Sequence, residues 1–244
     1  MHKSRGRRVA RTSAPDRRPI GTLPVAGLVP FIASWSSESA AQPEVTMRRG
    51  RLAYLKERPY DRDSNGILWR RVPSTPGKGK PQYGKVHFVR QRQAMDGLLC
   101  QVCGRPADDG SCADGLLWLL GEDPCDRNAW PEGVVTGHPP VCLPCAWQSV
   151  HSCPHLRQRY TAVRVRRYAL SGVHGVLYRP GFPRPVPHDV GGMDFGDDRM
   201  PWMQAAQLMM RLDDFRPVDL ETEYRACGVG RWTPTDQDGV PSET

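Results

Sequence analysis

Apolar and polar residues alternate over several short stretches of the chain, and this pattern predicts strands. The alternation is clearest over residues 160–169, and a second strand over 175–178 is expected to pair with it across Ser171-Gly172. Further strands are predicted at 28–35, 51–55, 66–72, 115–120 and 133–136. The Asn65-Gly66 dipeptide favours a tight turn between the second and third of these, because glycine adopts positive φ without steric cost. The last two are expected to flank a loop and so to form a hairpin-like region.

Three segments carry helical signals. Residues 87–99 predict a short helix with Arg90 and Arg92 pointing outward. A second helix is expected to begin at Cys142-Leu-Pro-Cys145, since proline is tolerated in a first helical turn, and to end before Pro154. The third helix is predicted from Pro201 to Asp213, where apolar side chains recur at helical spacing. These side chains are Trp202, Ala205, Ala206, Met209 and Leu212.

Together these elements predict a small, loop-rich α+β fold with short antiparallel strands. Glycine and proline number 24 each, and the apolar share of 39% is below that of typical globular domains. We therefore expect a modest core that a bound metal ion supplements. The predicted organisation is a disordered basic arm (1–24), a β-rich segment (25–86), a metal module (87–155), a β-hairpin plus C-terminal helix (156–214) and an acidic, loosely ordered tail (215–244).

Charge is unevenly distributed along the chain, whose formal net charge is +8. The first 20 residues carry seven Lys/Arg against one acid, whereas residues 213–244 carry three Arg against eight acids. A basic arm and a mildly basic body suit a polyanionic partner, and a solvated extension is the alternative. The longest apolar stretch, from Leu23 to Trp35, is broken by Pro24 and Pro30, and no apolar signal segment opens the chain. We expect a cytoplasmic protein with no membrane partner.

Two cysteine pairs with the same spacing are the strongest chemical signal in the chain. Cys100-Gln-Val-Cys103 and Cys142-Leu-Pro-Cys145 supply four soft ligands, the number that tetrahedral zinc prefers. A cytosolic chain with such pairs is more typical of a metal-binding than of a disulfide-bonded protein. Gly104 permits the positive φ that closes the first turn, and the second pair falls at a helix start, where the helix dipole favours thiolates. The sequence therefore predicts a structural Zn²⁺ site.

The order of these features, a knuckle followed by a hairpin and then ligands on a helix start, resembles the treble-clef zinc fold. The approach segment, Arg90-Gln-Arg-Gln-Ala-Met-Asp-Gly-Leu-Leu-Cys100-Gln-Val-Cys103-Gly104, is similar to that of zinc-containing HNH endonucleases. The family's Asp-His pair is absent, because His138 follows Gly137, and Ala146 stands where the family has His or Asn. The resemblance thus implies a degenerate, non-cleaving treble clef.

A second zinc site is a further possibility in the same region. Cys153 and His155 lie close together after the predicted second helix, and Cys112 and Cys125 lie in the preceding loop. No single spacing among these four residues is diagnostic of a metal site. The alternative is a free thiol at Cys153 with histidines at the surface.

Candidate nucleic-acid contacts lie on the 160–169 strand and on a basic loop. An ideal strand places Tyr160, Arg164, Arg166 and Tyr168 on one face, which suits phosphate contact and base stacking. The alternative is an ordinary solvated face. Lys78 and Lys80 add cations in the loop that follows the first strands.

Three functions follow from these observations. The first is a non-catalytic, zinc-stabilised protein that binds nucleic acid, with DNA as the expected partner. The second is an HNH-like metal-dependent endonuclease in which His138 or His151 serves as the base. The third is a protein–protein adaptor in which zinc is purely structural.

Overall fold

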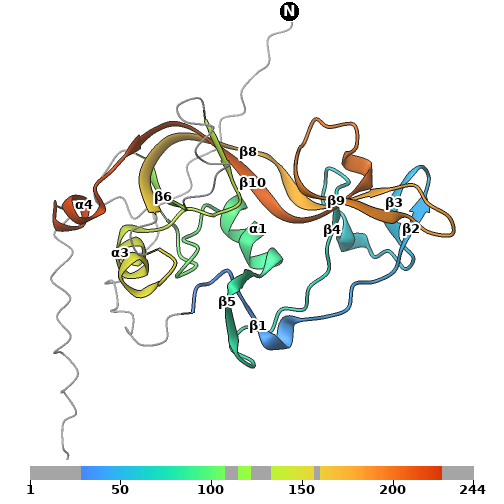
Figure 1. The fold of residues 1–244 in the computed structure, drawn as a ribbon, viewed down its shortest axis with the longest axis horizontal. Coiled ribbons are helices and arrows are strands. Elements are labelled where there is room, and N and C mark those ends of the chain that lie inside the picture. Colours follow the sequence, from blue (N-terminus) through green and yellow to red (C-terminus); the bar gives the residue numbers. More distant parts are fainter. Residues whose placement is uncertain (1–28, 108–114, 122–132, 157–159, 227–244) are drawn as a thin grey trace, which may run out of the picture.

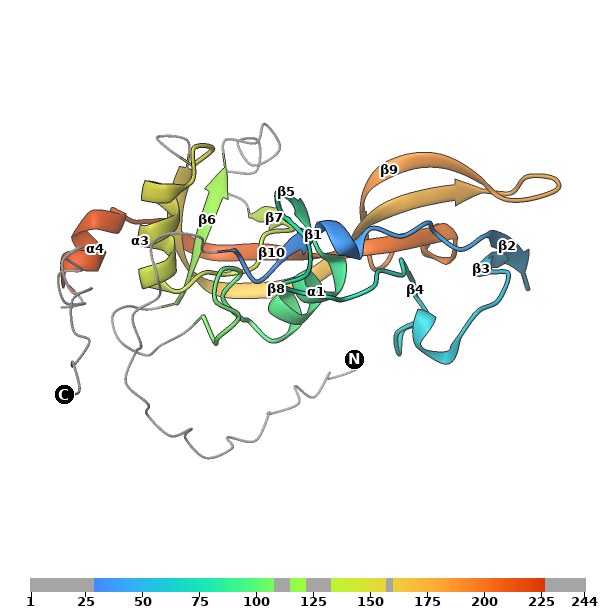
Figure 2. The same ribbon diagram turned by 90° about the horizontal axis from the view of Figure 1, so that it is seen from below.

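Two long strands, β8 (Tyr160–Arg179) and β10 (Met203–Pro217), organise the protein. The computed structural model describes residues 29–107, 115–121, 133–156 and 160–226. In this part of the chain β8 and β10 pair antiparallel from Met203↔Leu177 to Pro217↔Val163. They run along the length of the molecule in both views (Figures 1 and 2).

Four shorter strands complete a six-stranded sheet around this pair. These strands are β4 (Leu68–Trp69), β6 (Leu116–Gly121), β7 (Val134–Thr136) and β9 (Val186–Asp194). The path of the sheet is β4-β10-β8-β6, with β7 also pairing with β10 and β9 with β8. Only the β4–β10 pairing is parallel among the described strands. The result is a mixed α/β architecture.

Smaller elements surround the sheet. Two two-stranded ribbons are formed by β1 (Ala33–Trp35) with β5 (Pro81–Val86) and by β2 (Val45–Arg48) with β3 (Arg51–Tyr54). The α-helices of the described residues are α1 (Phe88–Asp96), α3 (Leu143–Ser152) and α4 (Leu220–Ala226). Short 3₁₀ turns are η1 (Ser36–Glu38), η2 (Pro59–Asp61) and η3 (Met200–Trp202). Helices α3 and α4 lie at one end of the molecule, and β2 and β3 lie at the other (Figures 1 and 2). None of the described helices is long and apolar enough to span a bilayer.

The predicted helix from Pro201 to Asp213 is wrong, because most of this segment is the strand β10. The first four residues of β10, Met203 to Ala206, are all buried, so the segment lacks the alternation of a strand with one solvated face. Its Ala, Gln, Met and Leu residues favour helices in isolation. Pairing with β8 on one side and with β4 and β7 on the other overrides that preference.

The predicted hairpin between 160–169 and 175–178 is also wrong, since both segments belong to the single strand β8. Gly172 is not a turn residue: a Cβ there would lie 2.2 Å from the carbonyl oxygen of Met193 on β9. Gly175 meets Gln204 of β10 in the same way, also at 2.2 Å. Both glycines therefore permit close approach of neighbouring strands.

Other strand predictions are confirmed in position but not in pairing. The Asn65-Gly66 turn forms, with Gly66 at φ +79° and its N–H donating to the Asp63 carbonyl at 3.0 Å. However, β3 pairs with β2 and β4 pairs with β10. Likewise β6 pairs with β8 and β7 with β10, so they do not form the expected hairpin with each other.

Helix α1 confirms the helical prediction for 87–99, but Arg90 does not point outward. Its side chain is buried, with only 5% exposed. The guanidinium forms a bidentate ion pair with buried Glu38 and also donates to the carbonyl oxygens of Phe31 and Ala33. Arg90 therefore attaches α1 to the segment around β1.

Candidate metal centre

The first cysteine pair lies in a tight turn that follows α1. The Gly104 N–H donates to the Cys100 carbonyl at 2.8 Å, and the Cys100 N–H donates to the Arg105 carbonyl at 2.6 Å. Gly104 has φ +70°, and a Cβ on it would lie 2.8 Å from Cδ2 of Phe31. Both the backbone conformation and the packing thus require glycine at this position.

The second pair lies at the start of α3. Cys142 is the N-cap residue, with φ −75° and ψ 152°, and Pro144 occupies the first turn as predicted. The Ala146 N–H donates to the Cys142 carbonyl at 2.9 Å and so closes the first helical hydrogen bond. Sulfurs at this end of a helix lie near its unpaired N–H groups, which favour negative charge.

Backbone hydrogen bonds hold the two pairs against each other and against the sheet. The Gln101 N–H donates to the Pro140 carbonyl at 2.9 Å, which connects the knuckle to the segment leading into α3. The Val141 N–H donates to Leu117 of β6 at 2.9 Å. On the other side, the Phe31 N–H donates to the Val102 carbonyl at 2.9 Å. The position of the site therefore depends on the sheet and on the segment before β1.

The Sγ atoms of Cys100, Cys103, Cys142 and Cys145 all lie within 4.8 Å of one another. The four thiols are free of disulfides. Cys103 and Cys142 have Sγ atoms 3.9 Å apart. Tetrahedral thiolates at a Zn–S distance of about 2.3 Å are ~3.8 Å from one another, so this separation suits a four-coordinate ion. The predicted convergence of the two pairs is confirmed.

Burial and charge distinguish the four sulfurs. Cys100, Cys142 and Cys145 are buried, whereas Cys103 is partly exposed. Hydrogen bonding with Cys100 is the main influence that lowers the pKa of Cys103, and hydrogen bonding with Cys100 also raises the pKa of Cys145. The Arg105 side chain, which hydrogen-bonds the Cys103 sulfur, adds a positive charge beside it. Without a cation, four thiolates this close cannot all ionise, so the donor set fits a divalent metal.

Within the described residues no other cluster of three or more Cys, His, Asp or Glu side chains could hold a metal. Cys153 and His155 lie just after α3, and Cys112 and Cys125 lie outside the described residues, so the second zinc site stays a prediction. His151 is exposed, and its Nδ1 lies 2.7 Å from the Trp147 carbonyl oxygen. The carbonyl oxygen of His138 accepts a hydrogen bond from the Trp118 indole.

Arg164 departs most from the predicted nucleic-acid face. It is only 8% exposed, and its guanidinium pairs with Glu223 of α4, with Nε 2.8 Å from Oε2. Residues 162–165 are all buried, so β8 does not present one polar and one apolar face there. Arg164 therefore attaches α4 to the sheet, and its predicted exposure is wrong.

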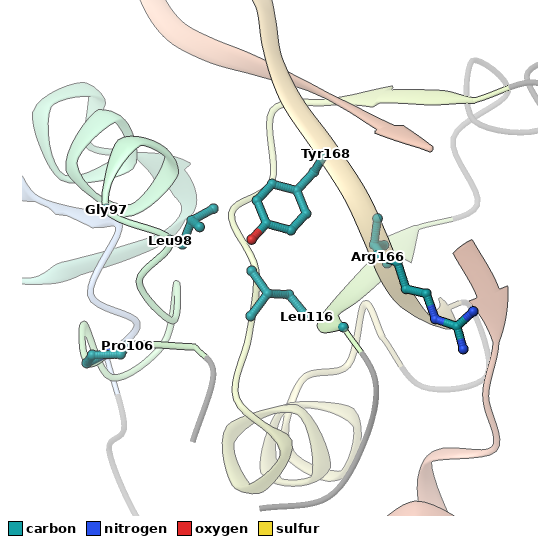
Figure 3. Close-up of a pocket in the computed structure, with 8 residues that line it drawn as sticks. Gly97, Leu98, Pro106, Leu116, Arg166 and Tyr168 are labelled. Carbon is teal, nitrogen blue, oxygen red and sulfur yellow. The ribbon is translucent and has the colours of Figure 1, made fainter. Parts of the chain in front are cut away.

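The two tyrosines of the predicted face pack against the core. The ring centroid of Tyr168 is 5.6 Å from that of Trp118. Tyr168 also lines a pocket of about 260 Å³, where its ring points toward Leu98 and Leu116, while the Arg166 guanidinium extends away from them (Figure 3). Tyr160 is partly buried, and burial raises its pKa. The strand itself is confirmed, but Tyr160 and Tyr168 do not form an open stacking surface.

Lys78 and Lys80 are exposed and lie in the loop before β5, and their contact with nucleic acid stays a prediction. Backbone hydrogen bonds hold this loop against η1: the Ser36 N–H donates to the Lys80 carbonyl at 2.9 Å. A different arginine-rich surface, near Trp69 and Arg92, was missed by the sequence analysis. The run Trp69-Arg70-Arg71 places an aromatic residue beside two cations and could have indicated this surface, but residues 66–72 were interpreted only as a strand.

Comparison with protein-family models, with curated proteins and with solved structures found no match to this chain. The geometry of the site itself brings four cysteine sulfurs together in a position suited to one metal ion.

Proposed function

We propose that this protein is a non-catalytic, zinc-stabilised nucleic-acid-binding protein. The observation that carries the proposal is the convergence of four cysteine sulfurs within 4.8 Å. Four thiolates and no carboxylate or water position are typical of structural zinc. Sulfur donors also bind iron in tetrahedral geometry, so the identity of the metal is part of the proposal.

A structural role agrees with the arrangement of the donors. Catalytic zinc sites keep one coordination position open for water or substrate, whereas a tetrathiolate site fills all four positions. Three of the four cysteines are buried, which leaves little access for a substrate. The ion would connect Cys103 and Cys142, which are 39 residues apart, and so stabilise the contact between the knuckle and α3.

We further propose that this module is related to the treble clef. Its support is the chain order of a Cys-x-x-Cys turn, intervening strands and a second pair at a helix start. The HNH-like resemblance of the approach segment remains part of this proposal.

Charge supports a polyanionic partner, and we propose DNA. The formal net charge is +8, and the first 20 residues hold seven cationic side chains. Such a distribution attracts phosphate backbones in a manner that weakens with salt.

Metal analysis tests the zinc site. We expect one zinc ion per purified chain by inductively coupled plasma mass spectrometry. The Cys145→Ser variant should lose it, and Cys153→Ser should retain it as the matched control, because Cys153 lies outside the cluster. Iron in place of zinc, with the visible absorption of an iron thiolate, would contradict the assignment of the metal.

Electrophoretic retardation of DNA tests the partner. The full chain should retard DNA at about 50 mM salt, and the retardation should weaken steeply as salt rises. Incubation of plasmid DNA with Mg²⁺ should leave it intact. Cleavage that is lost in a His138→Ala or His151→Ala variant would favour the endonuclease instead, and no retardation at low salt would favour the adaptor.

A further inference from the structure

A groove of about 500 Å³ lies between the η2–β4 region and α1, away from the cysteine cluster. Its walls combine arginines with aromatic rings. The residues that matter here are Arg58, Tyr60, Trp69, Arg70, Arg71 and Arg92. Asp61 also lines the groove, but it is 2% exposed and forms an ion pair with Arg71, so the remaining arginines give the groove a positive charge.

Each of these arginines lies over an aromatic ring. The guanidinium carbon of Arg92 is 3.9 Å from the Trp69 ring centroid, and that of Arg70 is 5.5 Å from the Phe88 ring centroid. At the rim the corresponding distance between Arg58 and Tyr60 is 5.9 Å. Arg71 lies over Tyr54 at 4.6 Å. Cation–π contacts of this kind hold guanidinium groups in place without neutralising them.

Trp69 is itself held in place. Its indole N–H donates to Oδ2 of Asp63 at 3.0 Å, and Oδ1 of Asp63 accepts from the backbone N–H groups of Asn65 and Ile67. The ring is 5% exposed and therefore serves as a rigid base for Arg92. The position of Arg92 is set before any ligand binds.

Arg70 and Arg92 differ from two other arginines that are buried or partly buried, one in this groove and one in the core. Arg71 and Arg90 each have a carboxylate within hydrogen-bond distance. Arg70 and Arg92 are both partly buried, yet within the described residues neither guanidinium has a carboxylate within 4 Å. Nε of Arg70 is buried without a hydrogen-bond partner. Burial lowers the pKa of Arg92, and the more distant charges of Asp63 and Asp96 oppose this effect only in part. Partial burial of a cation without a directly paired carboxylate is costly, and an anionic ligand would offset that cost.

We propose that this groove binds single-stranded nucleic acid, with phosphates on Arg70 and Arg92 and a base stacked on Tyr60. The inference rests on the proposed function and names the surface that would perform it. The Tyr60 ring is 72% exposed at the rim, and its hydroxyl accepts from Nη1 of Arg58 at 3.1 Å. An exposed ring beside fixed cations suits a strand with free base faces better than a duplex, whose bases are already stacked.

Fluorescence anisotropy with a labelled oligo(dT) of about 12 nucleotides tests the groove in the full chain. The Arg70→Gln/Arg92→Gln double variant should bind at least about ten-fold more weakly, and its salt slope should fall by about 1.4 for two lost phosphate contacts. Arg48→Gln/Arg179→Gln is the matched control. Both of its arginines are exposed and lie outside the groove, so the same loss of charge should weaken binding less than about three-fold.

A third variant separates stacking from charge. Tyr60→Ala changes an exposed side chain and leaves net charge and core unaltered, and it should weaken oligo(dT) binding about ten-fold. Zinc content and the thermal midpoint, measured for every variant, identify any loss of fold. The wild type should also prefer oligo(dT) to a duplex of equal length.

The outcomes separate the groove from the proposed function. Equal losses of oligo(dT) affinity in the two double variants, or no effect of Tyr60→Ala, would overturn the proposal that the groove is the binding site. The proposed function as a nucleic-acid-binding protein would still stand. Tighter binding to the duplex than to oligo(dT) would likewise overturn the groove as a site for single strands and leave the proposed function standing. No binding of either probe by the wild type at about 50 mM salt would overturn the groove and the proposed function together.

Discussion

Arg90 and Glu38 form a bidentate ion pair in the interior of the protein. Nη1 of Arg90 lies 2.7 Å from Oε1 of Glu38, and Nη2 lies 2.8 Å from Oε2. Backbone N–H groups of Trp35 and Thr75 donate to the same carboxylate. The pair joins α1, the β1–η1 segment and the loop after β4, so one buried contact connects three parts of the chain.

Replacing Glu38 should therefore be strongly destabilising. Glu38→Gln leaves the buried Arg90 cation without its counter-charge, which costs about 3 kcal/mol of unfolding free energy. Glu44→Gln is the control, because Glu44 pairs with Arg184 at the surface, where both side chains are more than half exposed. That change should cost less than ~0.5 kcal/mol. Urea denaturation of both variants measures their unfolding free energies. Equal losses would show that the buried pair contributes no more to stability than the surface pair.

The same pair predicts a dependence of stability on acid. Burial raises the pKa of Glu38, but hydrogen bonds from Arg90, Trp35 and Thr75 outweigh this effect and lower the pKa from 4.5 to about 2. Because the folded state holds this proton less tightly, the stabilisation is complete above pH 4.5 and is lost as the pH falls toward 2.

The contribution lost over that interval is on the order of 3 kcal/mol. Acid also releases metal from thiolates, so the measurement is the difference in unfolding free energy between the wild type and Glu38→Gln. The difference should shrink as the pH is lowered through this range. A constant difference down to pH 2 would contradict the assignment of the proton to Glu38.

Gly104→Ala should weaken both the fold and the metal site. The substitution adds the strain of a positive φ and places a methyl group against the Phe31 ring, at a total cost of about 2–3 kcal/mol. Gly50→Ala is matched to it, with φ +74° but no atom within 4 Å of the new Cβ, and should cost ~1 kcal/mol. Thermal unfolding and zinc transfer to a colorimetric chelator report the two effects. Identical behaviour of the two variants would mean that Phe31 yields to the methyl group.

Gln91 is expected to be a structural requirement despite its polarity. The side chain is fully buried, and its amide donates to the carbonyl oxygens of Gly137 and Leu208 while its oxygen accepts from the Leu208 N–H. Gln91→Ala leaves these backbone groups of the β7–β10 region unpaired and should cost about 2–4 kcal/mol. Gln93→Ala, on the exposed face of the same helix, should be nearly neutral. Similar unfolding midpoints for the two variants would argue against this role.

The cysteine cluster could be predicted from sequence because its signals are local. A Cys-x-x-Cys spacing, a glycine after the knuckle and a proline in a first helical turn each act within a few residues. The Arg90–Glu38 pair could not be predicted in this way, because its two residues are 52 positions apart in the chain. A charged side chain whose partner is unknown is expected to be exposed to solvent. The same reason explains the misplaced Arg164, whose partner Glu223 follows 59 residues later.

Strand β10 shows a second limit of sequence patterns. Its apolar residues match a helical period because both faces of the strand are covered at its start, so that burial no longer alternates. In β8, Gly172 suggested a turn, although its lack of a side chain serves close packing against Met193. In both cases neighbouring strands, distant in the chain, determine the structure.

The central place of β10 has a consequence for synthesis on the ribosome. This strand is the last of the sheet to be translated, yet it lies between β4 and β8 and also pairs with β7. Until residue 217 has emerged, the nascent chain holds apolar strand edges that have no neighbour. Such edges invite aggregation, so production of the intact protein should benefit from slow translation at low temperature or from chaperones that cover unpaired strands.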